Sequence, residues 1–420
     1  MNFRYKACAA IAALLLAAVP ARAGIWLIPM DLAQTDHLKA YGVAYWALEQ
    51  GVEVQWLLNY RAGSFLMEGG DFLSNRARLQ GVLAEEISAA ERERIMARIE
   101  AENMAAVLLE KAPRVAIYTP PNKQPWDDAV TLALTYAEIP YTTLWDEEVL
   151  GGGLDKVDWL HLHHEDFTGQ YGKFYASFKN TDWYRRQQAL FEKRAAEAGY
   201  AKVSEHKKAV ARRIRNYVSR GGFLFSMCSA TDTYDIALAA WKTDICDIMY
   251  DGDPPDPNAE AKLDFSETLA FENFHLIMNP LVYEYSDIDI SDYSRRDPTR
   301  DDFTLFEFSA KHDPVASMLT QCHVSVVKGF LGQTTAFRRS TIKKEVVILG
   351  EKEGTDEVKY LHGNHGRGVF SFLGGHDPED YQHLVGDPPT DLSLHRNSPG
   401  YRLILNNILF PAAKKKEQKT

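Results

Sequence analysis

The chain has 420 residues, of which 45% are hydrophobic and 25% are charged, a composition typical of globular proteins. This length is sufficient for one large core or for two domains. The formal net charge of −11 disfavours nucleic acid as a partner. After the first 23 residues, no stretch is long and apolar enough to span a bilayer.

Residues 1–23 have the features of a signal peptide. Arg4 and Lys6 precede an apolar stretch over residues 7–19, and Ala21-Arg22-Ala23 forms a small-x-small cleavage site. The mature chain is therefore expected to begin near Gly24. We expect it to be exported, most simply to a bacterial periplasm.

Three cysteines remain in the mature chain, and an odd number leaves at least one thiol free or intermolecular. If Cys246 pairs with Cys322, Cys228 is the free thiol. If Cys228 pairs with Cys246, it cannot act as a nucleophile. The sequence leaves both arrangements open.

Residues 24–112 predict an N-terminal α/β segment. A strand over residues 25–29, a helix over 38–48 and a strand over 52–58 form a strand-helix-strand extension, whose two strands are expected to be parallel. The loop after the second strand contains Arg61. This side chain could hold an anion at a ligand-binding edge, or it is an ordinary surface residue.

A second helix is predicted in the same segment. Ser88 and Glu91 form a capping box at its start. Apolar residues as far as Val107 and Leu108 follow at helical spacing, and Pro113 is expected to end the helix.

Residues 113–243 and 321–412 predict the core domain, in the α/β class. Alternating strands and helices are typical of a doubly wound, largely parallel sheet, a flavodoxin-like arrangement. The predicted strands cover residues 115–118, 141–145, 158–163, 223–227, 324–327, 345–349, 358–361 and 369–373. The predicted helices cover residues 126–138, 184–198, 204–219 and 398–410.

Two further segments lack this alternation. Residues 244–320 include the loop sequence Asp251-Gly252-Asp253-Pro254-Pro255-Asp256-Pro257 and predict an irregular insertion that covers the ligand edge of the sheet. Residues 413–420 form a short basic tail, which is expected to be solvated.

Cys228 follows the apolar strand predicted over residues 223–227. Ser229 and Asp232 can cap the helix that comes next. A cysteine at such a turn lies above the sheet edge and near a helix N-terminus, which favours the thiolate. The alternative is that Cys228 is a small buried hydrophobic residue, as free cysteines commonly are.

His376 follows another predicted strand, over residues 369–373. Its position and that of Cys228 are both expected at the carboxyl edge of one sheet. A histidine there can deprotonate a nearby thiol, and Glu379 can orient its imidazole, with Asp377 and Glu165 as rivals. Alternatively, His376 only closes a tight Gly-Gly turn.

A third cluster reads His161-Leu162-His163-His164-Glu165-Asp166. Alternation places His161 and His163 on one face of a strand, with His164 and Glu165 at its tip. These groups could bind a divalent metal together with His376, but HExxH and paired cysteine motifs are absent. We therefore expect no metal or other cofactor, and we interpret His163, His164 and Glu165 as pocket-lining or structural residues.

The order of elements over residues 114–410 resembles the class I glutamine amidotransferase-like fold. The stretch His365-Gly366-Arg367-Gly368-Val369-Phe370 and the later Gly375-His376 are similar to the ThuA-like branch, where a G-x-G-R-V-F strand runs into Gly-His. The resemblance implies that Cys228 is the nucleophile, His376 the base and Glu379 the orienting acid. The sequence departs from the family motifs in two places. No glycine flanks Cys228, and His376-Asp377-Pro378-Glu379 is one residue longer than H-P-E.

Residues 30–42 and 57–65 resemble exported Bacteroidota-type proteins that are often labelled asparagine synthetase B. An ATP-dependent asparagine synthetase of that type has a cysteine at its processed N-terminus and an S-G-G-x-D-S loop. The expected start near Gly24 and the stretch Gly151-Gly152-Gly153-Leu154-Asp155 provide neither feature. Asparagine synthesis is therefore not expected.

The leading hypothesis is an exported amidotransferase-like hydrolase. Cys228 would attack an amide or related acyl carbon of a small-molecule or cell-envelope substrate, with His376 as general base. Backbone N–H groups near Ser229 would stabilise the oxyanion. The alternatives are a non-catalytic ligand-binding or envelope-assembly protein on the same fold, and a ThuA-like carbohydrate-related protein.

Overall fold

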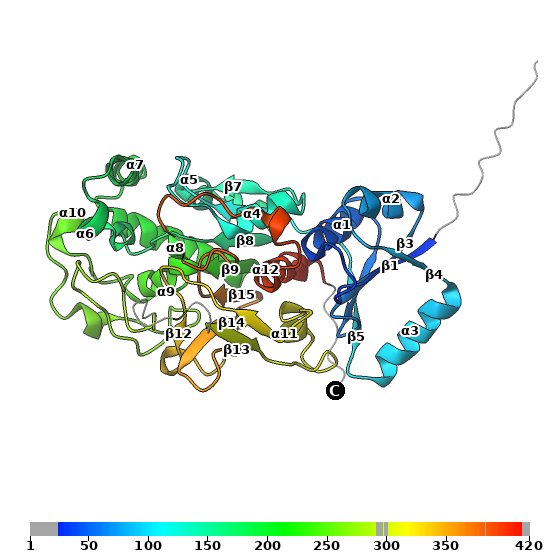
Figure 1. Cartoon of the computed structure of the whole chain (residues 1–420). Helices are drawn as coiled ribbons and strands as arrows, with labels where there is room; N and C mark the ends of the chain where they lie inside the picture. The colour runs from blue at the N-terminus through cyan, green and yellow to red at the C-terminus, as the bar shows by residue number, and fades with distance from the viewer. Residues whose placement is uncertain (1–23, 291–296, 298–300, 383, 414–420) are drawn as a thin grey trace, which may run out of the picture.

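The computed structural model describes residues 24–290, 297, 301–382 and 384–413, which form a mixed α/β structure with two sheets (Figure 1). The predicted signal peptide and residues 414–420 of the predicted tail lie outside the described residues. Within the described part of the chain, no helix combines the length and apolar character needed to cross a membrane.

The N-terminal unit is an antiparallel sheet in the order β4-β1-β3-β2-β5, with three helices. The predicted strand-helix-strand unit is present, but β3 pairs antiparallel with both β1 and β2 and separates them. The two predicted strands therefore run in the same direction without pairing. The elements are β1 (Gly24–Ile28), α1 (His37–Glu49), β2 (Val54–Leu58), β3 (Ser64–Gly69), α2 (Asp71–Leu79), β4 (Glu85–Ile87), α3 (Ala89–Ala101) and β5 (Ala105–Leu109).

Helix α3 begins where the capping motif predicts, because the Ser88 hydroxyl accepts the N–H of Glu91 at 3.1 Å. The helix ends at Ala101, however, well before Pro113. Val107 and Leu108 belong to β5, which pairs with β2. The prediction of one long helix was wrong because a short strand has too few residues to distinguish its periodicity from that of a helix.

The larger sheet has the order β11-β10-β13-β14-β15-β9-β8-β6-β7, with β12 paired to β14 outside this path. The strands from β15 to β7 are parallel, as the sequence predicts. The remaining strands continue the sheet as antiparallel ones. Short turns join β13 to β14 and β14 to β15, and such turns can connect only antiparallel neighbours. The parallel strands are β6 (Val115–Tyr118), β7 (Thr142–Leu144), β8 (Trp159–Leu162), β9 (Phe223–Met227) and β15 (Gly368–Leu373), and the others are β10 (Asp302–Leu305), β11 (Val326–Lys328), β12 (Phe337–Arg338), β13 (Val347–Glu351) and β14 (Glu357–His365).

Both faces of the parallel strands are covered. Ile117 and Phe225 belong to one buried hydrophobic cluster, which includes residues of α4 and α12. Tyr118 and Leu224 point the other way, into a cluster that includes residues of α5, α8 and α9. The helices of this unit are α4 (Ala129–Tyr136), α5 (Asp146–Leu150), α6 (Tyr175–Phe178), α7 (Asp182–Glu197), α8 (Val203–Ser219), α9 (Asp232–Ala239), α10 (Ile248–Asp251), α11 (Pro314–Leu319) and α12 (Pro399–Leu409).

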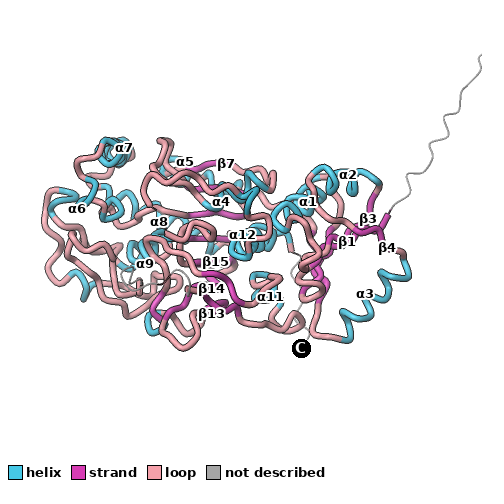
Figure 2. The backbone as a smooth tube through the Cα atoms, viewed as in Figure 1, coloured by secondary structure: helices cyan, strands magenta, loops and turns pink. Residues whose placement is uncertain are grey.

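The predicted insertion over residues 244–320 is mostly loop in its described part, and Figure 2 shows these loops in pink. Its β10 joins the sheet between β11 and β13. Lys173 of the core anchors the insertion, since its ammonium donates to the carbonyls of Ile277 at 2.7 Å and Glu284 at 2.6 Å. The Tyr283 ring lies 6.2 Å from the ring of Phe174. The insertion is therefore fixed to a loop that follows β8.

Helix α12 joins the two units, because it packs against α1 as well as α4 and α11. Its fully buried Arg402 donates to the carbonyls of Met30 at 2.9 Å and Ala62 at 2.7 Å, both in the N-terminal unit. The same guanidinium lies 3.1 Å from His323, whose ring stacks on that of His37. Burial and the Arg402 charge lower the pKa of His37 to about 4 and that of His323 to about 3. Both imidazoles are therefore neutral at pH 7.

Candidate functional site

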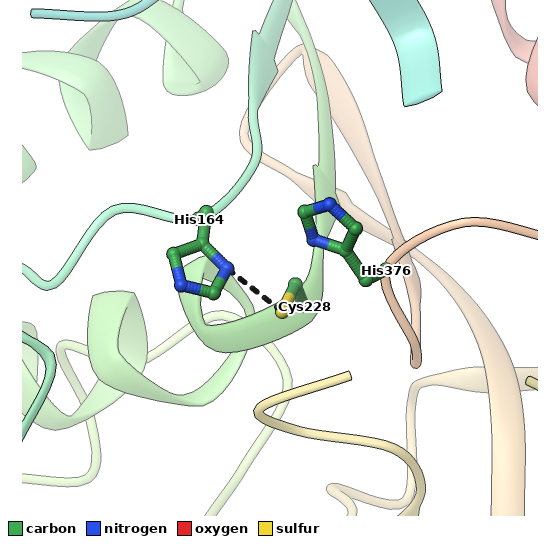
Figure 3. Close-up of side chains that lie close together, drawn as sticks. All are labelled: His164, Cys228 and His376. Atoms are coloured by element: carbon green, nitrogen blue, oxygen red, sulfur yellow. Dashed lines mark hydrogen bonds between the residues drawn. The ribbon is translucent and has the colours of Figure 1, made fainter. Parts of the chain in front are cut away.

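Three strand ends meet at the carboxyl edge of the larger sheet. The strand register sets Leu162 of β8 beside Ser226 of β9, and Met227 of β9 beside Leu373 of β15. The loops that leave these strands carry His164, Cys228 and His376. Figure 3 shows the two imidazoles on either side of the Cys228 side chain. The structure thus brings together Cys228 and His376, which the sequence places at one edge, and adds His164 to them.

Cys228 occupies a tight turn between β9 and α9. Its φ of +53° lies in the left-handed region, which residues other than glycine seldom adopt. The turn is held by the Cys228 N–H, which donates to the carbonyl of Gly375 at 3.1 Å, and by the Thr231 hydroxyl, which donates to the Cys228 carbonyl at 2.7 Å. Strain of this kind persists only where surrounding contacts fix the backbone, and it is common at active sites.

The Cys228 sulfur is completely buried among polar groups. It lies 3.3 Å from Nδ1 of His164 and accepts the backbone N–H of Gln333 at 3.1 Å. Burial raises the pKa of the thiol to about 12, although N–H groups of Gln333, Ser229 and Thr334 oppose the shift.

The predicted preference for a thiolate was therefore wrong. Helix α9 begins only at Asp232, so its dipole acts from too far away to outweigh desolvation. Cys228, Cys246 and Cys322 are all free thiols, and neither of the disulfides considered from the sequence forms.

His376 has neighbours other than those predicted. Its Nδ1 lies 2.8 Å from Nε2 of His163, and its Nε2 lies 3.4 Å from a carboxylate oxygen of Asp127. The Glu379 carboxylate instead lies 2.9 Å from Nδ1 of His395. The Glu379 N–H donates to the carboxylate of Asp377. This local turn accommodates the residue by which His376-Asp377-Pro378-Glu379 is longer than H-P-E. The predicted orienting role of Glu379 on His376 is thus not supported.

A second cluster of polar side chains, formed by His161, His163 and Asp128, lies beside His376. Nε2 of His161 is 3.2 Å from Nδ1 of His163. A carboxylate oxygen of Asp128 lies 3.5 Å from that Nε2 of His161 and 3.7 Å from that Nδ1 of His163. The two imidazoles lower the pKa of Asp128 against the effect of burial, which raises it. Burial and the nearby Asp377 raise the pKa of Asp127 to about 6. Neither aspartate stands out in the sequence, where the only signal for them is the helix-capping position of Asp128.

Of the other predicted binding residues, Glu165 and Ser229 lie at this edge of the sheet, whereas Arg61 does not. Glu165 is buried 3.8 Å from the Lys207 ammonium, and burial raises its pKa to about 7 despite that charge. Ser229 is buried beside Cys228, and its carbonyl accepts the Thr233 hydroxyl at 2.6 Å. Arg61 lies in the N-terminal unit.

The guanidinium of Arg61 pairs with Asp31 at 2.7 Å and with Glu85 at 2.9 Å. Both partners belong to the same unit, and Glu85 lies in β4. Arg61 is thus committed to two carboxylates away from the Cys228 edge, and the structure gives no support to its predicted role in binding an anion.

A pocket of ≈ 240 Å³ opens at the carboxyl ends of β6 and β8. Asp127, Asp128, His163, His164 and Glu165 line it, together with Trp126. The Trp126 ring covers His164, with 4.3 Å between ring centroids. Cys228 is not part of the lining, so a molecule in the pocket reaches the thiol only after side chains near His164 move.

Three groups of side chains in the described part of the chain have metal-ligand chemistry, with donor atoms within 4.8 Å of one another. Two of them, His164–Cys228–His376 and Asp128–His161–His163, lie at this edge. The third comprises Asp244, Cys246 and Asp251. The Lys202 ammonium already pairs with its two carboxylates, at 2.5 Å from Asp244 and 3.3 Å from Asp251.

The chain matches no protein-family model, and the search of curated proteins found no match. Among solved structures it is similar to two cytoplasmic proteins of Salmonella typhimurium, the second from strain LT2. The first is 11% identical with a TM-score of 0.35 and the second 12% identical with a TM-score of 0.37, and each similarity covers 72% of this chain and 100% of the other. An exo-beta-1,4-mannosidase from Opitutaceae bacterium strain TAV5 is 11% identical with a TM-score of 0.25, over 72% of this chain and 34% of the other.

Proposed function

We propose that the protein is a thiol-dependent hydrolase of amide or related acyl bonds, on a doubly wound, flavodoxin-like fold of the class I glutamine amidotransferase type, in its ThuA-like branch. It acts after export on a small-molecule or cell-envelope substrate. One observation carries this proposal. Cys228 occupies a strained left-handed turn at the carboxyl end of a parallel strand, with an imidazole nitrogen 3.3 Å from its sulfur.

In this proposal His164, rather than His376, is the general base. The thiol is neutral in the free protein, so its proton passes to Nδ1 of His164 as the sulfur attacks the acyl carbon. The imidazolium then gives this proton to the departing amine or alkoxide, which leaves a thioester on Cys228. Water, deprotonated by the same imidazole, attacks the thioester, releases the acid and restores the thiol.

The backbone supplies the groups that stabilise negative charge. The N–H of Gln333 points at the sulfur from 3.1 Å, and the N–H of Ser229 also favours a charged sulfur. Fixed N–H dipoles in a dry site stabilise a developing anion without reorganising. The substrate binds in the adjacent pocket, where Trp126 and His164 form one wall.

A cysteine-to-alanine comparison tests this function. We expect Cys228→Ala to lower turnover of p-nitrophenyl acetate and of an amide, L-glutamine, by about 10³-fold or more, because no other group supplies the nucleophile. Cys322→Ala, which removes a half-exposed free thiol, should turn over both like the unchanged protein. A Cys228→Ala protein as active as the Cys322→Ala control would contradict the proposal.

The complete burial of Cys228 favours a second candidate, a non-catalytic ligand-binding protein on the same fold. In that case Cys228 is a small buried hydrophobic residue. The pocket would bind a ligand through Trp126 and the polar groups around it. Cys228→Ala would then leave ligand binding unchanged, and neither protein would show turnover above background.

A further inference from the structure

Asp128, His161 and His163 form a compact group of nitrogen and oxygen donors that the proposed thiol chemistry does not use. His161 and His163 point from the same face of the β8 strand and its end, and Asp128 comes from the start of α4. Nε2 of His161 and Nδ1 of His163 are 3.2 Å apart, and Oδ2 of Asp128 lies 3.5 Å from the His161 atom and 3.7 Å from the His163 atom.

These distances fit the shell of a small divalent ion. Two ligands bound about 2.0–2.1 Å from Zn²⁺ at the tetrahedral angle are about 3.3 Å apart. A triangle with the three observed sides has a centre about 2 Å from each corner, which is the length of Zn–N and Zn–O bonds. An ion therefore fits between the side chains with little movement.

The remaining polar atoms of the three residues are already held in the orientation that metal ligands require. Nδ1 of His161 lies 3.1 Å from the carbonyl of Phe225 and donates to it, so Nε2 presents its lone pair to the other two side chains. Nε2 of His163 faces Nδ1 of His376 at 2.8 Å. The other carboxylate oxygen of Asp128 accepts the N–H of Thr131 at 2.8 Å. Metal-binding histidines almost always have such an anchored second nitrogen.

The charge of the group also favours a cation. In the described part of the chain, the basic side chains within 4.0 Å of the Asp128 carboxylate are the two histidines, with no lysine or arginine among them. His161 and His163 are buried, and the carboxylate is half-buried. A carboxylate removed from water needs a compensating positive charge, and a divalent ion supplies it where these three donors converge.

We propose that Asp128, His161 and His163 bind a divalent first-row transition metal, with Zn²⁺ the best match to the donor set. Two imidazoles and one carboxylate leave at least one coordination position open. Asp128 and His163 line the pocket at the ends of β6 and β8, so a pocket ligand or water can take that position.

The neighbouring group of His164, Cys228 and His376 is the weaker candidate. Its sulfur already accepts the backbone N–H of Gln333 and lies against Nδ1 of His164. Nδ1 of His376 faces His163 at 2.8 Å. Binding an ion there would break these contacts, whereas the ion on Asp128, His161 and His163 preserves them.

The test uses the full mature chain after treatment with EDTA and dialysis. Calorimetric titration with Zn²⁺ should show one ion per chain. Asp128→Asn should weaken binding by about 100-fold or more, since it removes the anionic ligand. The asparagine can still accept the Thr131 N–H, so α4 keeps its cap. Cys228→Ala should bind Zn²⁺ like the unchanged protein, which separates this site from the proposed thiol chemistry.

Co²⁺ provides a second readout that needs no variant. Bound by nitrogen and oxygen alone, it should give visible ligand-field bands without the intense near-ultraviolet thiolate-to-metal band. Absence of Zn²⁺ binding would overturn the proposal. A thiolate band, or loss of binding in Cys228→Ala with retention in Asp128→Asn, would also overturn it and move the ion to His164, Cys228 and His376.

Discussion

Replacing His164 with asparagine is expected to lower kcat for Cys228-dependent hydrolysis by about 10²–10⁴-fold, the range for loss of a general acid–base group. Nδ1 of His164 lies 3.3 Å from the sulfur, and the neutral, buried thiol needs a base in contact with it. Steady-state kinetics with p-nitrophenyl acetate measure the change. Because the imidazole acts mainly in the transition state, KM should change much less than kcat.

Two matched variants separate this assignment from the one implied by family resemblance. Glu379→Gln should leave kcat unchanged, since Glu379 pairs with His395. His376→Asn should cost less than His164→Asn, because His376 contacts His163 and Asp127. The opposite ranking, with His376→Asn inactive and His164→Asn active, would show that His376 is the base.

Arg402→Met is expected to destabilise the protein by about 2–4 kcal/mol, because buried acceptors that lose their donor each cost about 1–3 kcal/mol. The guanidinium donates to carbonyls of Met30 and Ala62 across the junction of the two units, and it is fully buried. Methionine fills much of the volume but donates no hydrogen bond. Urea unfolding followed by circular dichroism measures the loss as a lower midpoint.

Arg396→Met is the matched control for this effect. Arg396 is exposed just before α12 and donates to the carbonyl of Ser393 at 2.9 Å. Its replacement should change the free energy of unfolding by no more than about 0.5 kcal/mol. Equal midpoints for the Arg402→Met and Arg396→Met proteins would mean that Arg402 does not hold the two units together.

Local pattern was sufficient to predict some elements of the larger unit. The apolar run over residues 223–227 matches β9, and the amphipathic stretch over residues 204–219 matches α8 within one residue. Which strands pair with one another could not be predicted from the sequence of each segment alone. Nothing within the segment Ser64–Gly69 indicates that it inserts between β1 and β2. The strands predicted over residues 345–349 and 358–361 likewise look like those of a parallel sheet until the short turns that join β13 to β14 and β14 to β15 are considered.

The site was predictable only in outline. Strand ends place Cys228 and His376 at one edge, because the carboxyl ends of parallel neighbours meet there. The identity of the thiol's partner depends on side-chain direction after β8, where His164 turns to the sulfur and His163 turns to His376. Asp128 comes from a different loop, and its part in the site depends on how α4 packs beside β8. No spacing in the sequence encodes that arrangement.

Mapping the acyl group transferred from p-nitrophenyl acetate tests the central claim most directly. The protein is mixed with the ester, quenched in acid within the first turnover, digested and analysed by mass spectrometry. We expect an acetyl group on the peptide that contains Cys228, and none on that peptide in the Cys228→Ala protein. Rapid release of p-nitrophenol with Cys228 unmodified, or with the acetyl group on another side chain, would contradict Cys228 as the nucleophile.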